Sequence, residues 1–73
     1  MQNNIEYINF GRYLEKTRIA HKATIEEIAA GICTPSLITR VESGERMSSL
    51  LLRNRLLERI GTTSEEYETY AAI

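Results

Sequence analysis

The amino-acid sequence predicts an all-α domain built from five short helices. Strand signals are lacking, and the only proline is Pro35. Two Thr-x-x-Glu sequences, at residues 24–27 and 63–66, are capping boxes, which are typical of helix starts. Three glycines stand where helices are expected to end: Gly31, Gly44 and Gly61. We therefore expect a compact five-helix bundle.

The first expected helix covers roughly residues 7–22, because apolar positions recur there at helical spacing. Its inward stripe consists of Phe10, Leu14, Thr17 and Arg18. The second helix begins at the Thr24 cap and turns Ile28 and Ala29 inward. Gly31 ends this helix, and we expect the Ile32 side chain to pack in the turn before the third helix.

The third expected helix covers residues 34–43. Thr34 is a good N-cap, and Pro35 is favourable at the first helical position because its missing amide hydrogen would have no partner. Ile38 and Val41 point inward, which turns Ser36, Leu37, Thr39 and Arg40 outward. A leucine-rich fourth helix follows from about Leu50 to Ile60, and a short fifth helix follows the Thr63 cap.

Length and composition restrict the class of protein. Seventy-three residues make one domain, residues 1–73, which is too small for most enzymes. Cys33 and His21 are the only cysteine and histidine, so neither an internal disulfide nor a zinc site is expected. No secretory leader and no stretch long enough to span a bilayer is found, so we expect a soluble, cytoplasmic protein.

The charge is distributed unevenly along the chain. The net charge of -1 is unusual for a nucleic-acid binder. However, residues 1–61 contain nine basic and seven acidic residues, a balance of +2, and three glutamates leave the remaining residues at -3. We therefore expect the acidic charge to lie mostly away from any basic binding surface.

Several short motifs together carry a resemblance to a known family. These are Phe10-Gly11, Arg18, the capped segment 24–29, Ile38 and the Val-Glu-Ser-Gly sequence at 41–44. Over about residues 10–70 the sequence resembles the Cro and phage-repressor type of helix-turn-helix domain, also called the xenobiotic-response-element type. The resemblance implies a lambda-repressor-like DNA-binding fold in which the second and third helices form the helix-turn-helix. It also implies a transcription regulator of bacterial or prophage origin.

The stretch AAGICTPSLITRVESG most resembles the amino-terminal domain of Rgg and PlcR regulators of Firmicutes and their clostridial relatives. In those proteins the domain precedes tetratricopeptide-type helical repeats that bind a signalling peptide. No repeats follow in this sequence. The chain therefore looks like an isolated domain or a stand-alone relative.

The resemblance implies that the third helix enters the major groove of double-stranded DNA. Ser36, Leu37 and Arg40 would lie nearest the base edges, with Thr39 at the flank and Pro35 offering apolar contact. Arginine can bind guanine O6 and N7, serine most base edges, and leucine the thymine methyl group. At the phosphates, Thr24 and Thr34 would use hydroxyl and backbone amides at helix starts, and Arg46 would bind the DNA backbone.

Other notable residues are interpreted as structural. The resemblance pairs Arg18 with Glu42 as a half-buried ion pair between the first and third helices. Cys33 lies in the turn and is expected to be a packing residue rather than a redox sensor, because no basic residue flanks it to lower its pKa. Tyr67 and Tyr70 are expected to pack the last helix onto the core.

The fourth helix has more apolar surface than one face of an 11-residue helix can bury. Its leucines are Leu50, Leu51, Leu52, Leu56 and Leu57. We expect part of this surface, with Ile60 or Tyr70, to form a homodimer contact or to dock a C-terminal helical-repeat domain. A protein-interaction module of the same fold that does not read DNA is the alternative function. An enzyme is not expected, and neither is a cofactor, a metal, a membrane partner or a small-molecule substrate.

Overall fold

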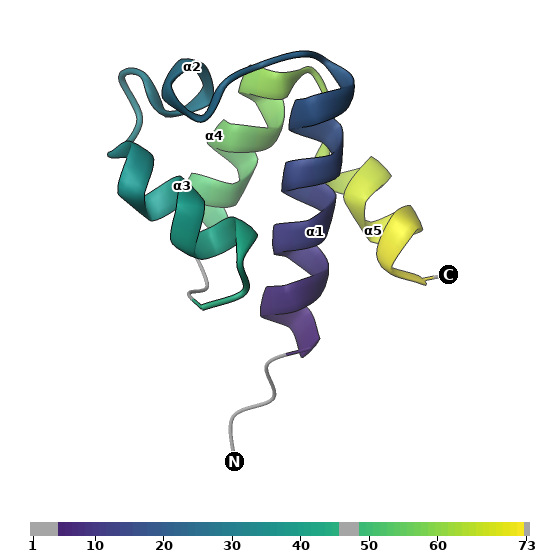
Figure 1. Cartoon of the computed structure of the whole chain (residues 1–73). Coiled ribbons are helices and arrows are strands. Elements are labelled where there is room, and N and C mark those ends of the chain that lie inside the picture. The colour runs from purple at the N-terminus through teal and green to yellow at the C-terminus, as the bar shows by residue number, and fades with distance from the viewer. Residues whose placement is uncertain (1–4, 46–48, 73) are drawn as a thin grey trace.

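The computed structural model describes residues 5–45 and 49–72, and these fold into five α-helices (Figure 1). The all-α, five-helix expectation is confirmed for this part of the chain. None of the described helices combines the length and apolar character needed to cross a bilayer. The helices are α1 (Ile5–Ala20), α2 (Ile25–Ala29), α3 (Pro35–Glu42), α4 (Leu50–Ile60) and α5 (Ser64–Ala72).

Side-chain oxygens at the helix starts accept hydrogen bonds from backbone amides that would otherwise lack partners. At α2 the full capping box forms: Thr24 Oγ1 accepts from the Glu27 amide at 3.0 Å, and the Glu27 carboxylate accepts from the Thr24 amide at 2.7 Å. Thr34, Ser49 and Thr63 accept in the same way at the starts of α3, α4 and α5. The starts of α2, α3, α4 and α5 are therefore each marked by a threonine or serine that caps the helix.

The core surrounds α1, which contacts α3, α4 and α5. Figure 1 shows α3 and α5 on opposite sides of α1. Phe10 and Leu14 of the expected stripe are fully buried, while Thr17 and Arg18 are half-buried. The buried apolar residues of the core are Phe10, Tyr13, Leu14, Ile28, Ala29, Ile38, Val41, Leu56, Leu57, Ile60 and Tyr67.

Aromatic residues join α1 to α5. The Phe10 and Tyr67 rings meet edge to face with centroids 5.2 Å apart, and the Tyr13 and Tyr70 centroids lie 5.0 Å apart. The Tyr13 hydroxyl hydrogen-bonds the buried Thr62 hydroxyl at 2.7 Å. The expectation that Tyr67 and Tyr70 pack the last helix onto the core is confirmed.

The backbones of α1 and α3 approach each other at Gly11. A side-chain carbon at this position would clash with the Val41 carbonyl oxygen and lie 2.8 Å from that of Glu42. Two turns further along α1, Arg18 donates to both carboxylate oxygens of Glu42, at 2.7 Å and 3.0 Å. The predicted ion pair is thus present. It joins α1 to the C-terminal end of α3.

We predict that Gly11→Ala lowers the free energy of unfolding by about 2 kcal/mol, because α3 must move away from α1 to relieve the clash. Gly31→Ala is the matched control, since the added carbon meets nothing within 4 Å. There the cost, about 1 kcal/mol, comes only from the positive φ. Urea denaturation measures both values. A Gly11→Ala variant as stable as the parent chain would show that the helices do not depend on this close approach.

Candidate nucleic-acid interface

A short turn connects α2 to α3. Gly31 adopts a φ of +76°, and the Ala29 carbonyl accepts hydrogen bonds from the Ile32 and Cys33 amides at 2.8 Å and 3.0 Å. From α4, Arg59 Nη1 donates to the Glu27 carbonyl at 2.8 Å. These bonds fix the direction in which the chain leaves α2 and enters α3. The sequence reasoning did not assign this role to Arg59.

One side of α3 is buried and the other is open. Ile38 is 0% exposed and Val41 is 1% exposed, and both face the core as expected. We use the term outer face of α3 for five exposed residues at its start and along its length: Thr34, Pro35, Ser36, Thr39 and Arg40. The polar side chains of the expected recognition helix are therefore accessible to a large ligand.

Leu37 departs from the expectation. It is half-buried and packs against the core, rather than pointing fully outward. In a helix of eight residues the apolar stripe is wider than Ile38 and Val41 alone, and it extends to the edge occupied by Leu37. Only an edge of this side chain is available for contact with a base.

The starts of α2 and α3 differ in their capacity to bind an anion. At α2, the Thr24 amide is already bonded to the Glu27 carboxylate, and Glu26 adds a second negative charge. The Thr24 amide is therefore not free to bind a phosphate, although its exposed hydroxyl can still donate. The first turn of α3 contains no acidic residue, so its positive end stays unneutralised near Thr34.

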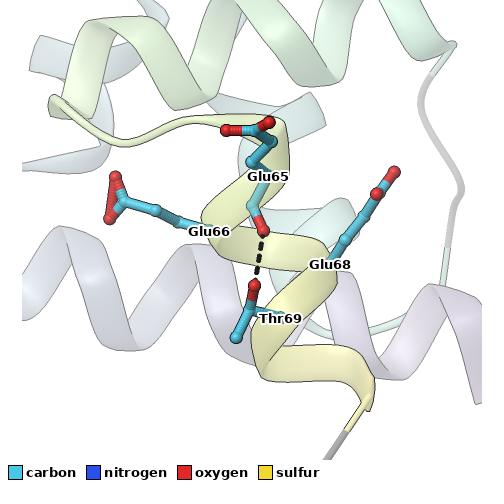
Figure 2. Close-up of a pocket in the computed structure, with 4 residues that line it drawn as sticks. All are labelled: Glu65, Glu66, Glu68 and Thr69. Carbon is cyan, nitrogen blue, oxygen red and sulfur yellow. Dashed lines mark hydrogen bonds between the residues drawn. The ribbon is translucent and has the colours of Figure 1, made fainter.

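The acidic residues of α5 lie on the side of α1 opposite α3 (Figure 1). All three, Glu65, Glu66 and Glu68, are exposed. Figure 2 shows their carboxylates pointing in different directions around the helix, with Thr69 donating to the Glu65 carbonyl at 3.0 Å. No group of three or more His, Cys, Asp or Glu residues in the described ranges could hold a metal ion.

The remaining predicted residues are structural or fall outside the described ranges. Hydrogen bonding to Glu42 raises the pKa of Arg18, which stays protonated. Burial raises the pKa of the Cys33 thiol, so less of the reactive thiolate is present at neutral pH. Half-buried Cys33 packs against the core, in agreement with the structural interpretation. Arg46 lies outside the described residues.

The leucines of α4 divide into two groups. Leu56, Leu57 and Ile60 are buried, so the expectation that Ile60 contributes to a docking surface is wrong. Leu50 and Leu51 are 67% and 71% exposed. The apolar excess of α4 therefore lies in its first turn.

Comparison with known proteins adds no assignment, because the chain matches no protein-family model and no curated protein.

Proposed function

We propose that this chain is a sequence-specific DNA-binding domain of a bacterial or prophage transcription regulator, with α3 inserted in the major groove. In this proposal α2, the turn and α3 act as a helix-turn-helix in a lambda-repressor-like arrangement. The observation that carries the proposal is the outer face of α3: it is exposed and polar, and an acid-free helix start adjoins it. The chain binds DNA without performing chemistry on it.

Each residue of the outer face has a distinct role in the proposal. Arg40 donates two hydrogen bonds to guanine O6 and N7, and Ser36 forms a hydrogen bond with the edge of an adjacent base. Thr34 binds a phosphate, and Thr39 lies at the flank with its hydroxyl donated to the Pro35 carbonyl at 3.3 Å. Leu37 contributes only its exposed edge to a thymine methyl group.

Flanking residues complete the proposed contacts. Pro35 gives apolar contact, Thr24 donates its hydroxyl hydrogen to a phosphate, and Arg46 binds the DNA backbone. The distribution of charge supports this orientation, because the glutamates of α5 lie beyond α1 and away from the proposed duplex.

We predict that Arg40→Ala relaxes preference at one base pair, at a cost of about 1 to 3 kcal/mol in binding free energy. The substitution should change the salt dependence of binding only slightly, because Arg40 contacts a base rather than a phosphate. Selection from random duplex DNA followed by anisotropy measurements over a salt series tests this. Lys16→Ala is the control, because this substitution removes the same charge from a side chain that lies over the Tyr70 ring, on the α5 side of the molecule. Equal effects of the two variants on all duplexes would leave Arg40 without a base-reading role.

A second candidate function is a protein-interaction module, which the exposed Leu50 and Leu51 favour. Ionic strength distinguishes the two functions. DNA affinity falls by roughly 0.9 logarithmic units per phosphate for each tenfold rise in salt, whereas apolar docking responds weakly.

We further propose that the DNA-binding form is a homodimer, since a single short helix reads few base pairs and paired half-sites lie about 34 Å apart. Leu51, which is 71% exposed, itself lines a hollow of about 190 Å³ together with Ile32 and Leu52, so each copy offers an exposed leucine and an apolar recess on one surface. The self-complementary arrangement suits a twofold contact. A C-terminal helical-repeat domain docked on the same surface is the alternative occupant.

We predict that Leu51→Asn weakens self-association, because the projecting side chain loses its apolar contact. Sedimentation equilibrium over a concentration series measures this. Ile19→Asn is the matched control, since Ile19 is also exposed, at 58%, but lies on α1. A parent chain that stays monomeric at its highest soluble concentration would contradict the dimer.

A further inference from the structure

A cleft of about 510 Å³ opens between the first turns of α1, the start of α4 and one side of α5. We call it the Arg53 cleft. Its lining combines one cation, two carboxylates, a tyrosine, an asparagine and two apolar side chains: Arg53, Glu6, Glu68, Tyr67, Asn9, Leu50 and Ala71. Its volume falls in the range typical of small-molecule sites. The outer face of α3 does not contribute to it.

Arg53, which lines the cleft, is half-buried and forms no ion pair with any residue of the described ranges. Its guanidinium carbon lies 4.7 Å from the Phe10 ring centroid and 5.1 Å from that of Tyr67. Its Nε is covered and has no hydrogen-bond partner in the described ranges, where the only ion pair found is that of Arg18 with Glu42. Covering this one N–H donor without an acceptor is costly, whereas the side chain as a whole is only half-buried and lines the cleft. A ligand carboxylate in the cleft can therefore pair with the positive charge of Arg53.

The carboxylates of the Arg53 cleft narrow the choice of ligand. Glu6 lies on α1 and Glu68 on α5, so carboxylates from two different helices line the cleft. They repel a simple anion such as phosphate and attract an ammonium group. Leu50, which is 67% exposed, and the exposed Ala71 provide an apolar wall. These features together match a small zwitterion with an apolar substituent.

We propose that the Arg53 cleft binds a free amino acid with an aliphatic side chain. The carboxylate of the ligand pairs with Arg53, its ammonium group lies towards Glu6 and Glu68, and its side chain covers Leu50. This site is independent of the proposed DNA-binding function, because it shares no residue with the outer face of α3.

The test is a titration of the ¹⁵N-labelled chain followed by amide chemical shifts. The probes are L-leucine, N-acetyl-L-leucine, which lacks the ammonium group, and L-leucine methyl ester, which lacks the carboxylate. We expect saturable shifts at Arg53 and Ala71 with L-leucine and about tenfold weaker binding of each derivative, because each has lost one charge contact. No saturable shift with L-leucine, or equal binding of the three probes, would overturn the proposal.

Two variants locate the site. Arg53→Met keeps an unbranched stem against the Phe10 and Tyr67 rings but removes the guanidinium, so it should abolish the shifts caused by L-leucine. Glu68→Gln should weaken L-leucine binding severalfold and should not weaken N-acetyl-L-leucine, an anion that the Glu68 carboxylate repels, with Glu65→Gln on α5 as the matched control. If Arg53→Met fails to fold, Glu68→Gln and the three probes still decide the question. Unchanged L-leucine binding in Glu68→Gln would contradict the assigned ammonium contact.

Discussion

The structure depends on the close approach of α1 and α3. Gly11 lets the α3 carbonyls of Val41 and Glu42 contact the α1 backbone, and the Arg18–Glu42 ion pair fixes the same two helices two turns further along α1. The arginine also donates to the Ala23 carbonyl at 3.1 Å, just before the α2 cap. Steric fit and charge pairing therefore act together on the C-terminal end of α3. The outer face of α3 stays exposed.

This arrangement separates surfaces of different character around one central helix. On one side of α1, α3 presents hydroxyls and Arg40 from a helix start that carries no acid. On the other side, the aromatic contacts of Tyr13 with Tyr67 and Tyr70 attach α5 and its exposed glutamates. A net charge of -1 is therefore compatible with a DNA-binding surface, because the field near a ligand depends on where charges lie rather than on their sum.

Much of the fold could be predicted from local signals, because caps and glycines act within one helical turn. The α4 bounds and the Thr24 capping box were predicted from sequence and are present in the structure. Burial was less predictable where it depends on distant elements: Leu37, which periodicity placed on open surface, and Ile60, which was one of two residues expected at a docking contact, both pack against the core. The Arg53 cleft was missed because α1, α4 and α5 create it jointly. Arg59 was missed for the same reason, since its acceptor is 32 positions away.

We propose that the outer face of α3, presented by the contact of α3 with α1, is the surface that binds a duplex. Mapping amide chemical shifts during titration with mixed-sequence duplex DNA at low salt tests it most directly. We expect the largest changes at Ser36, Thr39 and Arg40, while the amides of α5 remain nearly unchanged. Changes concentrated on α5 or at Leu51, or no change at any residue, would contradict it.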